Sequence, residues 1–573
     1  MKNSSLQEVE NYVTNPDVVF PPNNKNLSNL DLSELEFSDE NFDGATFDNC
    51  NLPRSRFIRC SFKGAIFKSV NIEDGYFEDC KLDGSTFDVI NLENSTSEGS
   101  DMDEENAGNS NLKGCKFYHC SLKGLSFKAT RLDCANFKNS DLCDSNFEGV
   151  SMFFSTFHDV DLVSSRFENS KLSCSKIHGN LSGAFFKDVD LIEVSFDMAN
   201  LENVNFEDSD LEKSVFYAVH AIGSNFKNSK LKSNTFTCTN FTGACFKGLE
   251  IEGCNFNDTV IEKTNFEDTI IKFSVFQDVS AEKANFKTAA LKRCEFYASG
   301  FLYSNFKNAS FQLAIMEKSS FSGSNFQGAD LENSIISKCF FDRTILKGGN
   351  FKKANIKGTF FNNSKMAGAN FEGAICKKSN FDRSNMEGVI LKKSNLTSSS
   401  FKKTNLCGAD LYGCDLEKAN LENAILENAD LTSAHLESVC LRCAKLKNAS
   451  LFRTDLSESD LEFTDFESAN LMDSKLIKVN LKNTILTGAD ISHADLEGAN
   501  LEGSILLKAN LRRANLENTN FKNSDLMGAK VDDLDFYGIN LEGVDMDCIH
   551  MNRKDDNWLE ELFLTINQLS IKN

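Results

Sequence analysis

Proline is almost missing from this chain of 573 residues, and it has a single tryptophan and eight tyrosines. The four prolines (Pro16, Pro21, Pro22 and Pro53) all lie near the start of the chain. Because proline cannot donate a backbone hydrogen bond, its absence beyond Pro53 indicates that nearly every later N–H is used in a ladder. Nothing in the sequence resembles an 18-residue membrane span, and the first thirty residues have no apolar core of a signal peptide. We therefore expect a cytoplasmic protein with no membrane insertion.

The sequence also has no recognisable catalytic or phosphate-binding motif. The seven histidines are scattered without a carboxylate or nucleophile at a recurrent offset, and no glycine-rich loop is suited to cradle a phosphate. The sequence therefore predicts no enzyme, no catalytic residue and no cofactor. A weak metal pattern, His435 with Cys440 and Cys443, lacks the fourth ligand that zinc prefers, so we interpret these as surface residues and predict no metal site. The net charge of −23 argues against direct binding of nucleic acid.

The 19 cysteines do not indicate a disulfide framework. Nine of them occupy a slot, two residues before a regularly spaced apolar residue, that otherwise takes alanine, serine, threonine or valine. These are Cys50, Cys60, Cys80, Cys115, Cys120, Cys254, Cys294, Cys339 and Cys414. Cysteine in this slot serves as a small apolar filler. Reduced thiols also fit a cytosolic protein.

The strongest feature is a period of five. Every fifth residue is apolar from Leu181 to Met551, and the same spacing runs from Leu27 to Ile177 with Ser97 as its polar exception. An α-helix repeats every 3.6 residues and a strand every two, so neither keeps this spacing on one face. The period predicts a coil that turns a corner every five residues, with the apolar residue and the small residue two before it pointing inward. The Asn or Asp just before the apolar residue is expected to bond locally and settle a turn.

Two places interrupt the pattern. Residues 93–110 are polar and acidic, and they form either one weak coil or an extruded loop of about 20 residues, of which we favour the loop. Between Ile177 and Leu181 the step is four residues. We interpret residues 178–180 as a corner shortened by one residue, in which Gly179 supplies an unusual φ. The predicted β-helix therefore has a first segment at 27–177 and a second at 181–553.

Short helices are predicted at both ends. Residues 1–26 form an N-terminal cap whose helix starts from the capping box Ser5 to Glu8. Residues 554–573 form an amphipathic helix that docks either on the last coil or on a second copy of the chain, which would make a homodimer. Its apolar stripe consists of Trp558, Leu559, Leu562, Phe563, Ile566 and Leu569.

Ala-Asp/Asn-Leu triplets recur through the C-terminal third of the sequence, such as Ala409-Asp410-Leu411, Ala419-Asn420-Leu421 and Ala499-Asn500-Leu501. With its period of five, the chain resembles the pentapeptide repeat family over almost its whole length. The resemblance implies an all-β fold, a right-handed quadrilateral parallel β-helix with one pentad per face and four per coil. With stacking at about 4.8 Å, about 26 coils would form a column of about 125 Å with short terminal helices.

Charge is the remaining signal. Residues 351–400 contain nine Lys or Arg and three Asp or Glu, whereas residues 451–550 contain nine and nineteen. The first stretch forms a basic collar that could bind a partner, although solvated faces that keep the protein soluble are the plainer interpretation. The collar lysines are Lys352, Lys353, Lys377, Lys378, Lys392 and Lys393.

These features favour a non-catalytic, acidic interaction scaffold that binds unidentified protein partners through its outer faces. The resemblance implies an alternative, because some bacterial pentapeptide repeat proteins protect DNA gyrase from quinolones by imitating duplex DNA. Duplex DNA carries one negative charge per about 1.7 Å, so the whole column would need roughly 75, and this chain has a net −23. A translocated bacterial effector is a further alternative, although no feature of the sequence shows export.

Overall fold

The computed structural model describes residues 26–100, 107, 109–532, 534 and 537–544. Within these residues the secondary structure consists of short strands and isolated β-bridges, with no helix. Contacts divide the chain into two compact units, Met1–Ala290 and Leu291–Asn573. Each unit is described by itself. The predicted helices at 1–26 and 554–573, including the stripe from Trp558 to Leu569, lie outside the described residues apart from residue 26.

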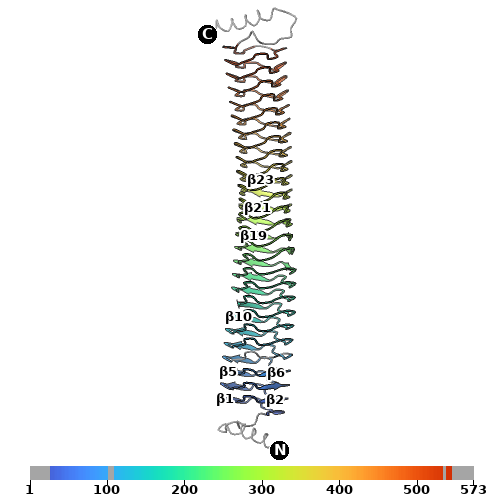
Figure 1. Cartoon of the computed structure of the whole chain (residues 1–573), viewed down its shortest axis with the longest axis vertical. Helices are drawn as coiled ribbons and strands as arrows, with labels where there is room; N and C mark the ends of the chain where they lie inside the picture. The colour runs from blue at the N-terminus through green and yellow to red at the C-terminus, as the bar shows by residue number, and fades with distance from the viewer. Residues whose placement is uncertain (1–25, 101–106, 108, 533, 535–536, 545–573) are drawn as a thin grey trace, which may run out of the picture. The chain divides into compact units, whose positions relative to one another are not determined.

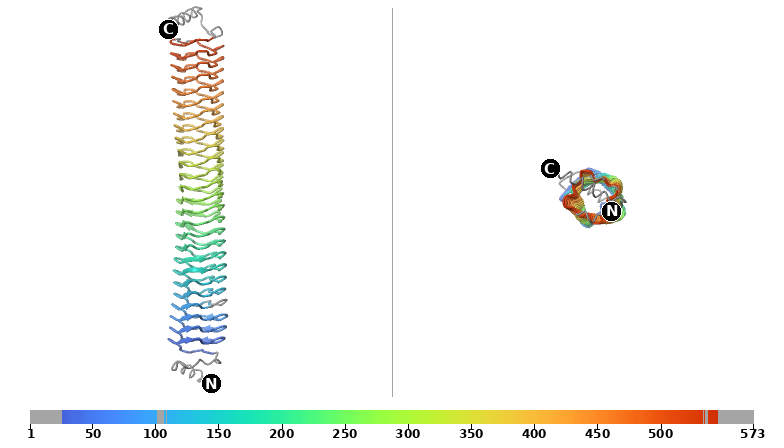
Figure 2. Two further views of the ribbon diagram at one scale, coloured as in Figure 1. Left: turned by 90° about the vertical axis from the view of Figure 1, so that its left-hand side faces the viewer. Right: turned by 90° about the horizontal axis from the view of Figure 1, so that it is seen from above.

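Both units are parallel β-solenoids whose coil contains 20 residues over most of their length. Phe216 pairs with Phe236 in the first unit, and Met316 pairs with Ile336 in the second. Parallel bridges recur every five residues around a coil, as in Asn200↔His220, Asn205↔Asn225 and Asp210↔Lys230. This confirms the predicted all-β, parallel solenoid. Figure 2 shows that, within each unit, successive backbone coils surround a common centre. The inward side chains are buried there.

In its described residues, the first unit has nineteen named strands in three ladders. The main ladder consists of β1 (Glu36–Ser38), β3 (Arg56–Ile58), β5 (Tyr76–Glu78), β7 (Thr96–Glu98), β8 (Lys116–Tyr118), β9 (Asn136–Lys138), β10 (Thr156–Asp161), β11 (Lys176–Asn180), β12 (Ser195–Asp197), β13 (Val215–Tyr217), β15 (Thr235–Thr237), β17 (Asn255–Asn257) and β19 (Val275–Gln277). The two shorter ladders consist of β2 (Thr46–Asp48), β4 (Ile66–Lys68) and β6 (Thr86–Asp88), and of β14 (Leu231–Lys232), β16 (Glu250–Glu252) and β18 (Ile270–Lys272). In Figure 1, β1, β5 and β10 lie on one side of this unit and β2 and β6 on another.

The second unit begins with four strands and then continues as isolated bridges. The strands are β20 (Glu295–Tyr297), β21 (Ile315–Glu317), β22 (Ile335–Ser337) and β23 (Asn355–Lys357). Beyond Lys357 the bridges keep the same register as far as Asn520↔Asn540. The solenoid therefore persists in the second unit even where its pairing is too brief to form a named strand.

The core follows the predicted pattern of inward positions. Phe236 is fully buried, and so is Asn234 two residues before it. Phenylalanines of successive coils stack, as in Phe246–Phe266, whose ring centroids lie 4.9 Å apart with planes 7° apart. Many small polar residues in the inner slot hydrogen-bond to a carbonyl of the preceding coil, as when Ser55 Oγ donates to the carbonyl of Leu32 at 2.9 Å. Ser394 Oγ and Ser474 Oγ are exceptions that have no partner in the described structure.

The nine cysteines assigned to this slot are all buried and free. Their thiols approach carbonyl oxygens as the serine hydroxyls do, with Cys60 Sγ 3.4 Å from the carbonyl of Phe37. Burial raises the pKa of both Cys254 and Cys339 to about 12. Cys254 and Cys339 are therefore protonated fillers of the core.

Each corner is built by two residues with distinct tasks. The Asn or Asp before the apolar residue accepts a hydrogen bond from the backbone two residues on, as when Glu202 N donates to Asn200 Oδ1 at 3.1 Å. The second residue after the apolar position adopts a left-handed conformation, with φ of 58° at Glu193. The asparagines also bond between coils, since Asn200 Nδ2 donates to Asn180 Oδ1 at 3.0 Å. The predicted local bond is thus accompanied by an amide ladder.

The polar stretch predicted as a weak coil or a loop falls partly outside the described residues. Its residues 96–98 form β7, which pairs with β5 and β8 in the regular register. Ser97 lies in the inward column between Phe77 and Phe117 and is buried. It leaves a cavity of about 20 Å³ lined by these two rings and neighbouring side chains. The structure does not describe residues 101–106 and 108, so the loop stays a prediction there.

The register changes at the corner where the sequence predicts a missing residue. Phe157 pairs with Ile177, 20 residues later, but Val160 pairs with Gly179, 19 residues later. Gly179 has a φ of 151°, and a Cβ added there would lie 2.2 Å from the carbonyl oxygen of Val160. This position therefore requires glycine. Beyond it, bridges such as Asn180↔Asn200 resume the 20-residue register.

Candidate functional site

The outer surface consists of columns of side chains that repeat once per coil. Neighbouring parallel strands lie about 4.8 Å apart, so a side chain directly contacts its equivalents 20 residues before and after it. The residue types in a column therefore determine whether its side chains form ion pairs, hydrogen-bond to each other as amides, or repel each other as like charges. Two stretches of surface show how differently the columns are used.

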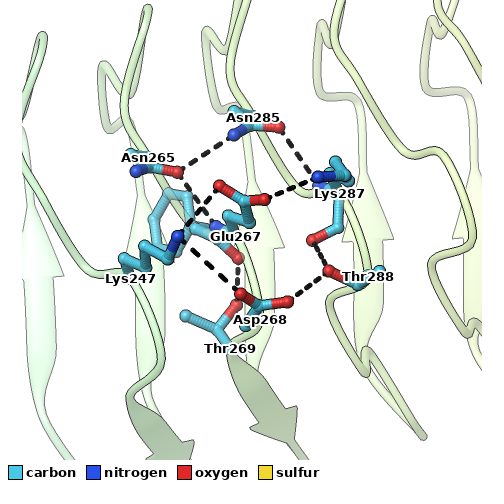
Figure 3. A network of polar contacts seen from close by, with 9 residues as sticks. Lys247, Asn265, Glu267, Asp268, Thr269, Asn285, Lys287 and Thr288 are labelled. Carbon is cyan, nitrogen blue, oxygen red and sulfur yellow. Dashed lines mark hydrogen bonds and ion pairs between the residues drawn. The ribbon is translucent and has the colours of Figure 1, made fainter.

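In the first unit, residues 247–288 carry what we call the paired columns (Figure 3). Glu267 lies between two lysines, with Lys287 Nζ at 2.8 Å from its Oε1 and Lys247 Nζ at 3.3 Å from its Oε2. Hydrogen bonds from Lys287 and Lys247 lower the pKa of Glu267 below its ordinary value. Beside them, Asn285 Nδ2 donates to Asn265 Oδ1 at 3.1 Å. The charged and amide side chains of these columns thus bind to one another within the solenoid.

In the second unit, the predicted basic collar is arranged differently. Lys352, Glu372 and Lys392 share one column, in which Lys352 Nζ lies 2.8 Å from Glu372 Oε2. Lys392 Nζ lies 5.2 Å from the centroid of the Tyr412 ring, a cation–π distance. Lys353 and Lys393 stand in the adjacent column, with Gly373 between them, because their backbones follow the same ladder.

The other two collar lysines, Lys377 and Lys378, occupy the next quarter of the coil after the buried Cys376. The structure therefore brings Lys352, Lys353, Lys392 and Lys393 together and places this pair beside them along the chain. Within the described residues, no ion pair is formed by four collar lysines: Lys353, Lys377, Lys378 and Lys393. These four charges are available to a partner.

Exposed apolar side chains accompany these lysines. Ile375, two residues before Lys377, is 44% exposed. On the other side, Asn380 pairs with Phe360 and Phe360 with Phe340. The two rings therefore lie in the column of Asn380, two residues after Lys378 and one and two coils before it. Phe340 and Phe360 stack on the surface with centroids 5.2 Å apart and planes 7° apart. We refer to Phe340, Phe360, Ile375 and the four unpaired lysines as the collar face.

In the acidic tail, residues 451–550, basic side chains neutralise part of the negative charge that the composition indicates. Several of its carboxylates are ion-paired with a Lys or Arg in the same column, one coil away. The pairs are Glu462–Arg442, Glu467–Lys447, Asp455–Lys475, Glu502–Lys482 and Asp532–Arg512.

The sequence reasoning missed one group of side chains. His158, Asp159 and His178 come together at the shortened corner of the first unit. The signal was present, because the two histidines are one coil apart and the missing residue lies beside them. In contrast, Cys440 and Cys443 belong to no group of three metal-ligating side chains in the described part of the chain, and His435 Nδ1 lies 3.5 Å from Glu437 Oε1.

The fold and these columns define a repeat protein of the β-solenoid class, built from five-residue units. The sequence model for "Pentapeptide repeats" matches residues 41–79, 110–149, 177–248 and 324–543, which together make up more than half of the chain. The chain belongs to the pentapeptide repeat family. A comparison with curated proteins finds no match.

Solved structures similar to this chain include other pentapeptide repeat proteins. HetL, involved in heterocyst differentiation regulation in the cyanobacterium Nostoc sp., is 24% identical, with 36% of this chain and 92% of HetL covered and a TM-score of 0.17. Trypsin-treated QnrB1, a plasmid-mediated fluoroquinolone resistance protein, is 20% identical, with 40% and 97% covered and a TM-score of 0.24. Rfr23 from the cyanobacterium Cyanothece is 37% identical over 16% of this chain and 60% of its own, with a TM-score of 0.14.

A search of the described residues for a helix of sufficient length and apolar character to span a membrane finds none.

Proposed function

We propose that this protein is a non-catalytic interaction scaffold that binds an acidic protein partner through the collar face. The framework is the right-handed column of about 26 coils, with a helix at each end, that the sequence predicts. The observation that supports the proposal is the local excess of positive charge beside exposed apolar side chains. Residues 351–400 contain nine Lys or Arg and three Asp or Glu, and Lys353, Lys377, Lys378 and Lys393 form no ion pair with a described residue. Pentapeptide repeat solenoids are generally non-catalytic.

The collar face has the composition of a protein-binding surface. Aromatic residues are enriched at protein interfaces, and a stacked pair such as Phe340 and Phe360 offers apolar area at low cost in side-chain entropy. The lysines around it would steer a negatively charged partner toward the rings and fix its register. Such a partner would be an acidic segment with apolar side chains at the spacing of the coils.

The experiment compares two full-length variants of equal charge. In the first, Lys353, Lys377, Lys378 and Lys393 are changed to Glu. In the matched control, Lys445, Lys478, Lys508 and Lys530 are changed to Glu; these also lie in the second unit and form no ion pair with a residue that the structure describes. Proteins are cross-linked and co-purified with each tagged chain from its own cells, and each enriched protein is then purified and titrated against all three chains.

We expect an acidic protein that binds the unchanged chain and the control with similar affinity and binds the collar variant at least tenfold more weakly. Equal binding to all three chains would remove the collar face from the proposal. If no protein binds the unchanged chain in the purified titration, the scaffold proposal itself is wrong.

DNA mimicry of the kind known in this family is the weaker alternative. Its best support is the acidic tail, but Glu462, Glu467 and Glu502 are each neutralised by a basic residue one coil away. Duplex DNA presents a continuous line of unpaired phosphates, one charge per about 1.7 Å. A gyrase supercoiling assay with added protein, with and without quinolone, tests it, and protection from the drug would favour mimicry over the scaffold.

The C-terminal segment 554–573 provides the proposed route to a homodimer. A chain that ends at residue 553 is compared with the full chain by light scattering. A dimer that becomes a monomer on truncation supports this role, whereas two monomers leave the segment as a cap of its own last coil.

A further inference from the structure

The shortened corner of the first unit creates a local geometry that the regular coils lack. Between Phe157 and Val160, β10 contains two residues, His158 and Asp159, whereas β11 contains only His178 between the partners Ile177 and Gly179. Two residues facing one make a β-bulge, which re-aims side chains. The extra residue brings a carboxylate between the imidazoles of two successive coils.

The three side chains converge closely. Asp159 Oδ2 lies 2.8 Å from His158 Nδ1, and Asp159 Oδ1 lies 3.0 Å from His178 Nδ1. The two imidazole rings have centroids 5.1 Å apart. One ligand atom from each residue lies within 4.8 Å of the other two.

Hydrogen bonding alone does not satisfy this arrangement. His178 Nδ1 lies 3.3 Å from the backbone N–H of Asp159 as well as 3.0 Å from its carboxylate. A protonated Nδ1 can donate to the carboxylate but then opposes the N–H. An unprotonated Nδ1 can accept from the N–H but then faces the lone pairs of the carboxylate. A cation between the imidazole nitrogen and the carboxylate oxygen takes up the Nδ1 lone pair and removes its repulsion with the carboxylate, in exchange for the long 3.3 Å hydrogen bond from the Asp159 N–H.

The surroundings favour a cation. An open depression beside the cluster is lined by Asn139, Ser140, Asp141, Asp159, Val160, Asp161 and Asn180. Three of these residues are aspartates, and such a concentration of negative charge raises the local concentration of cations. Lys138, the register partner of His158 on β9, is the basic neighbour on that side.

We propose that His158, Asp159 and His178 bind one divalent transition-metal ion of the zinc type. The ligands are Nδ1 of each histidine and the carboxylate of Asp159, and water completes the tetrahedron. Bonds of about 2.1 Å place tetrahedral ligand atoms about 3.4 Å apart. The two His–Asp distances of 2.8 and 3.0 Å would therefore lengthen by about half an ångström, and all three ligand atoms already lie within 4.8 Å of one another. Imidazole with carboxylate suits zinc and its neighbours better than Mg²⁺ or Ca²⁺.

The ion would join β10 to β11 at the one place in the described first unit where the 20-residue register changes. It binds the folded chain and not the separated coils, so it stabilises this corner by mass action. The inference does not depend on the collar face, which lies in the second unit.

The test uses the full chain with its accessible thiols alkylated, because the exposed cysteines would otherwise compete for the metal. Zn²⁺ binding is measured by competition against a chromogenic chelator. The variants are His158→Gln, Asp159→Asn and His178→Gln, and the matched control is His220→Gln, an exposed histidine of the same unit. We expect one tight ion per chain, at least tenfold weaker binding in each cluster variant and unchanged binding in the control. Equal affinity in all chains would overturn the site.

A second measurement needs no substitution and so remains decisive if a variant fails to fold. X-ray absorption of the Zn²⁺-loaded, alkylated chain reports the atoms around the ion. A shell of nitrogen and oxygen with the outer scattering of two imidazoles supports the site. A sulfur-containing shell, or one without imidazole, would overturn it.

Discussion

The paired columns of the first unit and the collar face of the second share one backbone plan but use their outer positions in opposite ways. Glu267 is held between Lys247 and Lys287. In the collar, Lys353 and Lys393 stand in one column with Gly373 between them, and neither forms a direct ion pair with a described carboxylate. Lys353 and Lys393 lie two coils apart, about 9.6 Å along the solenoid, so they repel only weakly. This column lacks the ion pairs that contribute to stability in the paired columns.

This difference separates what the solenoid needs from what it presents. The core pattern is the same in both stretches, with Phe266 and Phe371 each fully buried. The outer columns can therefore vary without loss of fold, and a stretch that forgoes available pairing is a candidate for interaction with another molecule. Stability and binding should respond to different substitutions in the two regions.

The largest effect is expected in the core, where both regions should respond alike. Phe266→Ala and Phe371→Ala each remove a stacked, fully buried ring, at a cost of about 3–5 kcal/mol in the free energy of unfolding. Hydrogen exchange of the coils on either side measures the loss locally, which is appropriate for a repeat protein. A much smaller loss at one site would show that the two cores are not equivalent.

Charge reversal should separate the regions. Lys353→Glu with Lys393→Glu should weaken binding of the acidic partner at least tenfold and leave thermal stability nearly unchanged, because neither lysine forms an ion pair with a described residue. Lys247→Glu with Lys287→Glu should lower the melting temperature and leave the affinity for the partner unchanged, because two new carboxylates would face Glu267. Paired measurements of affinity and melting temperature check this, and parallel behaviour of the two double variants would contradict the distinction.

Salt should sharpen the same contrast. Raising the salt concentration from 0.05 to 0.5 M shortens the Debye length from about 14 to about 4 Å, so binding at the collar should weaken severalfold. The unfolding temperature should change little, because the core supplies most of the stability. Titrations at both concentrations, with the collar variant as control, measure this. A salt-independent affinity would mean that the partner is held by the rings alone.

The smallest effect concerns acid. Since hydrogen bonds from Lys287 and Lys247 lower the pKa of Glu267, this carboxylate stabilises the folded state above its unfolded pKa, and the contribution is lost as pH falls through the lowered value. The unchanged chain should therefore lose slightly more stability than Glu267→Gln below the ordinary pKa of 4.5. Denaturant unfolding of both chains at pH 7 and pH 3 tests the sign, and a larger loss in the variant would reverse it.

Much of the fold could be predicted because one period controls it. The spacing from Leu181 to Met551 specifies the inward residues, and the four-residue step after Ile177 marks the corner where the register shifts. Ser97 was the visible exception, and it proved to lie within a regular strand, since backbone pairing on both sides holds β7 in place despite the small side chain.

The candidate sites were harder to predict, because pairing depends on which column a charge occupies. Composition located the basic collar, but it could not distinguish Lys352, which contacts Glu372, from its neighbour Lys353. The cluster of His158 with His178 escaped for a related reason. A regular coil places the two imidazoles in one column, but only the extra residue of the bulge turns Asp159 between them.

The coil of 20 residues also sets which changes of length the family can tolerate. Gain or loss of a whole coil leaves every remaining side chain above its former partner. Gain or loss of a single pentad keeps the apolar residues inside but rotates all later columns by a quarter turn within the unit, which would carry Lys377 and Lys378 away from the Phe340–Phe360 stack. Gain or loss of one pentad can therefore change which outer side chains lie side by side without replacing any existing amino acid in the core.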